Sequence, residues 1–212
     1  MDYRYYLFDF DGTLVDSMPT YVSVMLRILD EHGVLYGDDV MKIITPLGYA
    51  GAAKYFLDNF KIDSTQEELI KKMHSYALAA YRDEIEAKSN VVYVLHELKA
   101  RSCSLNVLTA SPHEMLDPCL KRLGIFDLFD NIWSCEDFNT TKADPKIYRM
   151  AAERIGADMR QILFLDDNYN ADLSAKNAGM PVCGVFDPSS KEYENEIRSI
   201  TDHYITDFIE LL

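Results

Sequence analysis

The fold is decided by the stretch YYLFDFDGTL at residues 5–14, in which an apolar run leads into two aspartates and a glycine. A run of this kind predicts a buried strand that ends at Asp9 and Asp11. Residues two apart on a strand point to the same face, roughly 6.5 Å apart along the chain. Two negative charges therefore converge where the strand ends, and such a pair requires a cation, a proton or open water nearby.

A second apolar run, ILFL at residues 162–165, also leads into acids, Asp166 and Asp167, and Asp172 follows. Taken alone, the Asp-x-Asp-Gly pattern at residue 9 would also fit a turn, because Asp and Gly are common turn residues. Two strands that both end in carboxylates favour a metal site over two unrelated turns.

Composition limits the class of protein. With 212 residues, of which 48% are hydrophobic, the chain can bury a full core as one large domain or as a core with a small accessory domain. The 35 acidic residues outnumber 21 Lys and Arg, which gives a net charge of -14. A charge of that sign disfavours nucleic acid as a partner, and an anionic substrate would need local positive groups.

The expected location is the cytoplasm. The first residues resemble no signal peptide, and no apolar run approaches the roughly 20 residues of a membrane span, so no membrane partner is expected. The four cysteines, at positions 103, 119, 135 and 183, form no Cys-x-x-Cys pair. This scatter favours reduced, buried thiols over a disulfide framework or a zinc site.

The order of elements predicts two parts. Residues 17–86 carry helical patterns and no clear strand, whereas helices and strands alternate from residue 90 onward. This predicts an α/β fold with a Rossmann-like parallel sheet core, formed by 1–16 and 87–212, and a helical domain inserted after the first strand at 17–86. Ligands bind at the carboxyl ends of such strands, where Asp9, Thr109 and Asp166 would converge.

Four motifs in this order resemble the haloacid dehalogenase-like hydrolase superfamily, in the subclass with a helical cap domain and in its phosphoglycolate phosphatase-like branch. They are DFDGTL at 9–14, LTAS at 108–111, Lys142 within TKADPKIY at 141–148, and LDD at 165–167 leading to AGM at 178–180. The resemblance covers essentially the whole chain. It departs from the common pattern at Ala110, where many relatives have Asn, and at Ala143, where Pro is frequent.

The resemblance implies a Mg²⁺-dependent phosphatase that hydrolyses a small phosphorylated metabolite through an aspartyl-phosphate intermediate. Asp9 would be the nucleophile, and Asp11 would protonate the leaving group and then activate water. Dehalogenases and phosphonate-cleaving relatives lack the second aspartate, so Asp11 favours the phosphatases.

By similarity, the metal ligands would be Asp9, the carbonyl of Asp11, and Asp167, with Asp166 binding directly or through a water. The phosphate-binding residues would be Thr109, Ala110, Ser111 and Lys142, although Thr109 also fits a helix N-cap. Asp172 has two equal interpretations, a contribution to the outer metal site or a helix cap.

The insert at 17–86 would be the cap domain that closes over the site and sets specificity. Its segment 45–51 is expected to be a flexible loop, with Tyr49 and Lys54 as candidates for substrate contact. Relatives that move phosphate within a sugar carry a histidine near the position of Tyr21, and no histidine occurs between Gly12 and Glu31, which disfavours a mutase. Alternatives remain a sugar-phosphate mutase, a phosphonate hydrolase or a non-catalytic binding module, and no oligomeric state is predicted.

Overall fold

The computed structural model describes residues 1 and 3–212. They form two compact units, Met1–Asp16 with Glu86–Leu212, and Ser17–Ile85. Glu86, expected as the last residue of the helical insert, belongs instead to the first unit. Its carbonyl accepts a hydrogen bond from the N–H of Asp16 at 3.0 Å, which pairs the two chain segments at the edge of that unit.

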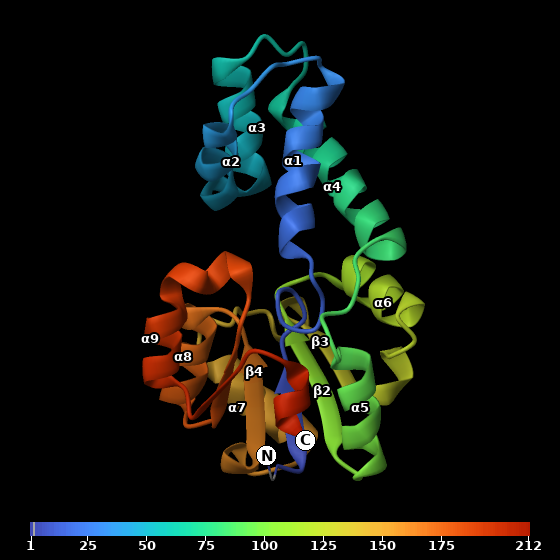
Figure 1. The fold of residues 1–212 in the computed structure, drawn as a ribbon, viewed down its shortest axis with the longest axis vertical. Helices are drawn as coiled ribbons and strands as arrows, with labels where there is room; N and C mark the ends of the chain where they lie inside the picture. Colours follow the sequence, from blue (N-terminus) through green and yellow to red (C-terminus); the bar gives the residue numbers. More distant parts are fainter. Residues whose placement is uncertain (2) are drawn as a thin grey trace. The chain divides into compact units, whose positions relative to one another are not determined.

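The first unit contains a six-stranded sheet in the order β3-β2-β1-β4-β5-β6, and every strand pair is parallel (Figure 1). The parallel, Rossmann-like core predicted from the sequence is therefore confirmed. The strands are β1 Tyr5–Phe8, β2 Ser104–Thr109, β3 Asn131–Ser134, β4 Ile162–Asp166, β5 Val182–Val185 and β6 His203–Ile205.

Helices cover both faces of this sheet. Leu7 packs in one cluster with residues of α7 and α8, whereas Phe8 stacks on Phe208 and contacts Phe129 edge to face on the opposite side of the sheet. This alternation is the side-chain period of a strand. The helices are α5 Val91–Ala100, α6 His113–Arg122, α7 Lys146–Ile155, α8 Tyr169–Ala178 and α9 Glu194–Ile200.

Short 3-10 helices complete the first unit, and the chain ends in β6 followed by the 3-10 helix η6. These segments are η2 Phe126–Leu128, η3 Cys135–Phe138, η4 Met159–Gln161, η5 Pro188–Tyr193 and η6 Phe208–Leu211.

The position of β1 determines where the site lies. Phe8, its last residue, is in register with Val107 on one side and Leu165 on the other. The chain order reverses here, because β2 lies on one side of β1 and β4 on the other. In open parallel sheets, ligands bind outside the carboxyl ends of the strands at this switch point.

The second unit is helical, with α1 Met18–Glu31, α2 Asp38–Ile44, α3 Gly48–Asn59 and α4 Gln66–Asp83. Its core contains Met25, Ile28, Phe56 and Met73, all fully buried. Helix α4 begins with a capping box, in which the Thr65 side chain and Glu68 satisfy each other's backbone N–H groups.

The expectation of a flexible loop at 45–51 is wrong. Residues Thr45–Leu47 form the 3-10 helix η1, and Gly48 begins α3. Gly48 has a φ of +64°, a conformation that glycine adopts readily. The glycine therefore allows the chain to change direction between η1 and α3, and it does not mark a flexible segment.

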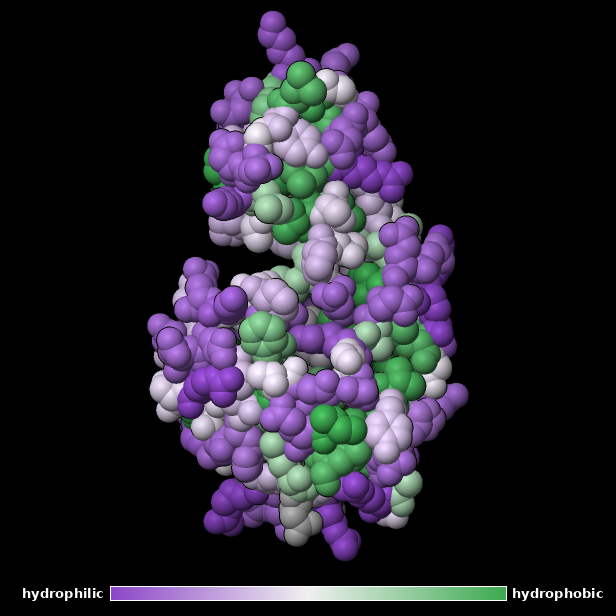
Figure 2. All heavy atoms as spheres, viewed as in Figure 1, coloured by the Kyte–Doolittle hydropathy of each residue, from purple (hydrophilic) through white to green (hydrophobic). Residues whose placement is uncertain are grey.

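One face of the molecule is rich in hydrophilic side chains. The face shown in Figure 2 is mostly hydrophilic, with smaller hydrophobic areas between the polar ones. Across the described residues, no helix combines the length and the apolar character that crossing a bilayer requires. All four cysteines are buried thiols, as expected.

Candidate active site

Asp9 follows β1 directly and lies at the carboxyl edge of the sheet. Its N–H donates to the carbonyl of Leu165 at 2.8 Å, which extends the pairing of β1 with β4 by one residue. The Asp9 side chain is buried. The backbone therefore fixes this carboxylate at the switch point of the sheet.

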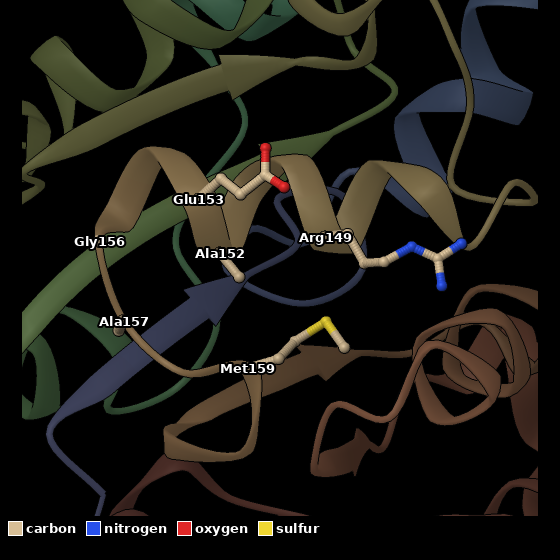
Figure 3. Close-up of a pocket in the computed structure, with 6 residues that line it drawn as sticks. All are labelled: Arg149, Ala152, Glu153, Gly156, Ala157 and Met159. Carbon is tan, nitrogen blue, oxygen red and sulfur yellow. The ribbon is translucent and has the colours of Figure 1, made fainter.

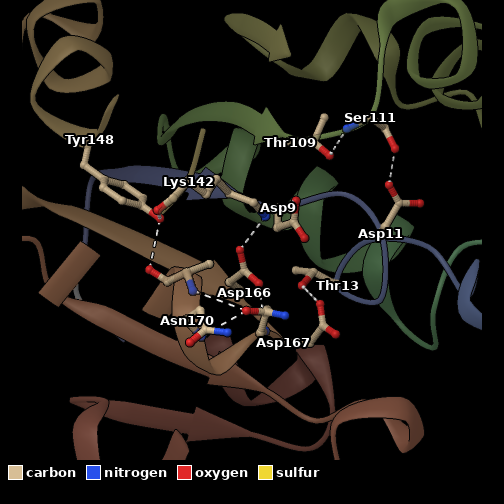
Figure 4. A network of polar contacts seen from close by, with 12 residues as sticks. Asp9, Asp11, Thr13, Thr109, Ser111, Lys142, Tyr148, Asp166, Asp167 and Asn170 are labelled. Carbon is tan, nitrogen blue, oxygen red and sulfur yellow. Dashed lines mark hydrogen bonds and ion pairs between the residues drawn. The ribbon is translucent and has the colours of Figure 1, made fainter. Parts of the chain in front are cut away.

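Lys142 joins the acids from the two strands. Its Nζ lies 2.7 Å from Oδ1 of Asp9 and 2.7 Å from Oδ2 of Asp166. The phenol oxygen of Tyr148 lies 3.0 Å from the carbonyls of both Lys142 and Ala171, so it holds the backbone of Lys142 against α8 (Figure 4). Tyr148 stands within the quoted motif, but the sequence gives no sign of this positioning role.

Asp9, Asp166 and Asp167 form a cluster in which one carboxylate oxygen from each lies within 4.8 Å of the others. All three side chains are buried. Both carboxylate oxygens of Asp166 accept hydrogen bonds: Oδ1 from the N–H of Asn168 at 2.8 Å, and Oδ2 from the ammonium of Lys142. Buried carboxylate oxygens at this spacing suit a hard divalent cation.

The pKa shifts of these residues agree with a site that can hold a cation. Burial, followed by the charge of Asp166, raises the pKa of Asp9 to about 7, against the opposing effect of Lys142. Burial also raises the pKa of Asp167 well above its usual value. Burial alone would lower the pKa of Lys142, but Asp166 and Asp9 raise it well above its usual value. The residues present therefore fit a bound cation, which would offset charge that a single lysine leaves unbalanced.

Asp11 lies two residues beyond Asp9 and contacts the segment that follows β2. Ser111 Oγ donates to Asp11 Oδ2 at 2.5 Å, and the N–H of Ser111 donates to Thr109 Oγ1 at 3.1 Å (Figure 4). Thr109 is the last residue of β2 and is buried. The structure thus brings the first two predicted motifs together.

The helix-cap interpretation of Thr109 is wrong, because α6 begins at His113 with Pro112 at its N-cap position. Asp172 caps no helix either. The N-cap of α8 is Asn168, whose side chain accepts the N–H groups of Asn170 and Ala171, and Asp172 lies one turn inside the helix.

Asp172 is fully buried, and neither of its carboxylate oxygens has a hydrogen-bond partner among the described residues. Burial raises its pKa well above the usual value, and the charges of Asp166 and Asp167 raise it further. Asp172 is not a member of the three-carboxylate cluster found among those residues.

Gly12 and Thr13 connect the loop after β1 to Asp167. Thr13 Oγ1 donates to Asp167 Oδ1 at 3.2 Å. Gly12 has a φ of +73°, and a Cβ atom on it would lie only 2.6 Å from Asp167 Oδ2. Glycine is therefore required here both by the backbone conformation and by the close approach of the carboxylate.

The two candidates for substrate contact lie in the helical unit. Tyr49 stacks on Tyr21, with ring centroids 5.3 Å apart. Lys54 is exposed and pairs with Asp58 one turn further along α3, at 2.9 Å.

A pocket at the other end of the sheet is a poor candidate. It is lined by the end of α7 and the segment that enters β4, so it lies near the amino end of that strand (Figure 3). The described residues that line it include one acid and one base, Glu153 and Arg149, and none of the clustered carboxylates.

Comparison with known proteins agrees with this geometry. The family model described as haloacid dehalogenase-like hydrolase matches residues 6–185. Pyrophosphatase PpaX of Bacillus velezensis is 30% identical over 182 residues, which cover 84% of this chain and 81% of the relative. Phosphoglycolate phosphatase of Psychrobacter arcticus is 27% identical over 209 residues, with 94% and 90% covered.

Among solved structures, that of a candidate β-phosphoglucomutase from Thermotoga maritima has a TM-score of 0.86 at 21% identity, covering 99% of this chain and 96% of that one. At this identity the likeness concerns the fold. The family match spans most of the chain and includes the strand ends that carry the acids. The chain belongs to the haloacid dehalogenase-like hydrolase family.

Proposed function

We propose that the protein is a Mg²⁺-dependent phosphatase that hydrolyses a small phosphate monoester through an aspartyl-phosphate on Asp9. The observation that carries the proposal is the arrangement around Lys142, whose ammonium contacts both Asp9 and Asp166 within a cluster of three buried carboxylates. The names of the relatives, which include a pyrophosphatase and a phosphoglycolate phosphatase, support phosphate chemistry.

Asp9 acts as the nucleophile. Its carboxylate oxygen forms a bond to phosphorus while the bond from phosphorus to the substrate oxygen breaks. Lys142 stabilises the charge on Asp9 and on the transferred phosphoryl group, because its ammonium is already within 2.7 Å of the Asp9 carboxylate.

Asp11 acts as acid and then as base. It gives a proton to the leaving alkoxide, and the resulting carboxylate takes a proton from the water that opens the acyl phosphate. The products are the alcohol and inorganic phosphate. The hydroxyl of Ser111 holds the Asp11 carboxyl in place, at 2.5 Å.

The donor set for the cation is the Asp9 carboxylate, the carbonyl of Asp11 and the Asp167 carboxylate. We assign Asp166 to the support of Lys142, because both Asp166 oxygens already accept hydrogen bonds. When bound, Mg²⁺ supplies positive charge that screens the repulsion between the anionic nucleophile and the anionic phosphate.

Thr109, Ala110 and Ser111 hold the phosphate: the Thr109 hydroxyl and the Ala110 N–H donate to it, and the Ser111 N–H, which donates to Thr109 Oγ1, orients that hydroxyl. The helical unit serves as a cap domain that excludes water and selects the leaving group. Tyr49 and Lys54 are our candidates for the residues that contact that leaving group.

The test is phosphate release from a panel of phosphomonoesters, inorganic pyrophosphate and p-nitrophenyl phosphate, with Mg²⁺ and with EDTA. We expect Mg²⁺-dependent release that Asp9→Asn abolishes, and one preferred compound would identify the substrate. No release with any divalent metal would contradict the proposal. Conversion of a hexose 1-phosphate to the 6-phosphate would favour a mutase, and cleavage of a carbon–phosphorus bond would favour a phosphonate hydrolase.

Intact biochemical properties in Asp9→Asn, together with tight binding of phosphorylated compounds, would favour a non-catalytic binding module.

A further inference from the structure

Lys88 is a largely buried cation that the proposed reaction does not use. Its side chain is 17% exposed, and its ion-pair partner Asp187 is 1% exposed. Lys88 lies next to Ala87, which forms an antiparallel bridge with Val15 at the end of the loop that follows β1. A buried lysine is costly unless its charge and its donors are satisfied, so its acceptors indicate what it does.

The ammonium of Lys88 has three acceptors from two parts of the chain. Its Nζ lies 2.6 Å from the carbonyl of Gly12, 2.6 Å from the carbonyl of Phe186 and 3.0 Å from Oδ2 of Asp187. An ammonium carries three N–H donors, so this set uses all of them. Lys88 thus connects the loop after β1 to the segment that follows β5.

The carbonyl held by Lys88 belongs to the peptide that contacts Asp167. A Cβ on Gly12 would lie 2.6 Å from Asp167 Oδ2, and Thr13 donates its hydroxyl to the same carboxylate (Figure 4). Asp11 precedes Gly12 directly. Any shift of the Gly12 carbonyl would therefore move Asp11, the proposed acid and base. It would also change the packing of Gly12 against Asp167.

We propose that Lys88 is a positioning residue: by holding the Gly12 carbonyl, it fixes Asp11 for proton transfer to the leaving group. This inference rests on the proposed function. The competing explanation is that Lys88 only neutralises Asp187.

Asp187 has a task of its own. Its Oδ1 accepts the N–H and the hydroxyl of Ser189, at 2.9 and 2.6 Å, where it caps the 3-10 helix η5. An amide at position 187 keeps an acceptor for Ser189 and leaves Lys88 its two carbonyls. Because the new amide N–H₂ group would face the Lys88 ammonium in place of Oδ2, Asp187→Asn is used only together with a neutral residue at position 88.

The experiment compares two double variants, each of which combines Asp187→Asn with a neutral residue at position 88. Lys88→Met with Asp187→Asn removes every donor to Gly12, whereas Lys88→Gln with Asp187→Asn retains an N–H donor on a polar side chain. Because neither pair leaves a buried charge unpaired, both avoid the instability expected of Lys88→Met alone. Thermal melts check that all variants are folded.

Turnover is measured on two substrates, the best alkyl phosphate of the panel and p-nitrophenyl phosphate. The nitrophenolate leaves without a proton, so the loss of a positioned general acid affects the alkyl phosphate most. We expect the Met pair to lose about 100-fold in kcat on the alkyl phosphate. On p-nitrophenyl phosphate the loss stays below about tenfold, and the Gln pair recovers part of the activity.

Two results would overturn the inference: a kcat on the alkyl phosphate in the Met pair equal to that of the wild type, or an equal loss on both substrates. Failure of the proposed function would be separate, because it would appear as wild-type protein without phosphatase activity, or as activity that survives Asp9→Asn.

Discussion

The Nζ atom of Lys142 lies 2.7 Å from Oδ1 of Asp9, so the proposed nucleophile carries its own counter-ion. The same ammonium contacts Asp166 at the end of β4. One cation therefore links the carboxyl ends of the two central strands, and both the stability of this edge and the proposed chemistry depend on it.

Lys142→Met tests that link. We expect a loss of 10²–10³-fold in kcat, which is typical when one group that stabilises transition-state charge is removed. We also expect a decrease of about 3 kcal/mol in the free energy of unfolding, since the change leaves buried carboxylates without their cation. Steady-state kinetics and urea unfolding measure the two effects. Lys146→Met, an exposed lysine on the same segment, is the control, and a loss of the same size there would contradict the assignment.

Ser111→Ala tests how Asp11 is held. Without the hydroxyl that donates to Asp11 Oδ2, we expect kcat to fall about tenfold on an alkyl phosphate and less on p-nitrophenyl phosphate. Ser111→Thr keeps the hydroxyl and should retain most of the activity. If the alanine and threonine variants behaved alike on the alkyl phosphate, the hydrogen bond would have no role in turnover.

His113 gives a prediction about pH. Its Nδ1 lies 2.8 Å from Asp117 and its Nε2 lies 2.9 Å from Asp137. The hydrogen bond to Asp117 is the main reason that the pKa of His113 is raised above its usual value, and Asp137 adds to it. Both nitrogens can donate at once only in the protonated ring.

The pKa of His113 is thus higher in the folded state, so the stabilisation is fully present below the unfolded pKa of about 6.5 and is lost as pH rises through the folded value. His113→Gln should destabilise the protein more at pH of about 5.5 than at pH of about 9. Urea unfolding at both pH values measures this, with His96→Gln, an exposed histidine of α5, as the control. A deficit that grew with pH would contradict the sign.

The sequence predicts those features of the structure that depend on residues adjacent in the chain. The apolar runs that end at Asp9 and Asp166 predict two strands of a parallel sheet, because strand, turn and charge are adjacent in the chain. The helix at residues 48–59 was not predicted, since Pro46, Gly48 and Gly51 favour a loop on local grounds. Packing of Phe56 in the core of the helical unit outweighs that preference.

The pairs that depend on long-range contact gave no signal in the sequence. Lys88 and Asp187 meet only because the segment after β5 runs beside the loop that follows β1. His113 and Asp137 come from α6 and η3, and their sequence neighbours suggest ordinary surface charges. Motif order could identify the acids of the site, whereas the residues that support them required the fold.

Asp172→Leu tests the buried acid of α8. A carboxyl with a raised pKa must take up a proton when the chain folds, so it lowers stability increasingly as pH rises above the unfolded value of about 3.9. Leucine removes that cost, and the melting temperature of the metal-free protein should rise more at pH of about 7 than at pH of about 5. Asp172→Asn separates loss of charge from gain of apolar contact. A lower melting temperature in the leucine variant at both pH values would indicate an unseen partner for Asp172.

The central claim is that Asp9 carries the phosphoryl group during turnover. Its most direct test is to mix the protein with Mg²⁺ and its best phosphomonoester, quench in acid within one turnover, and map the phosphoryl group by peptide mass spectrometry. The account predicts a phosphoryl group on the peptide that contains Asp9, and none in Asp9→Asn. Turnover with the group on another residue, or undiminished turnover in Asp9→Asn, would contradict it.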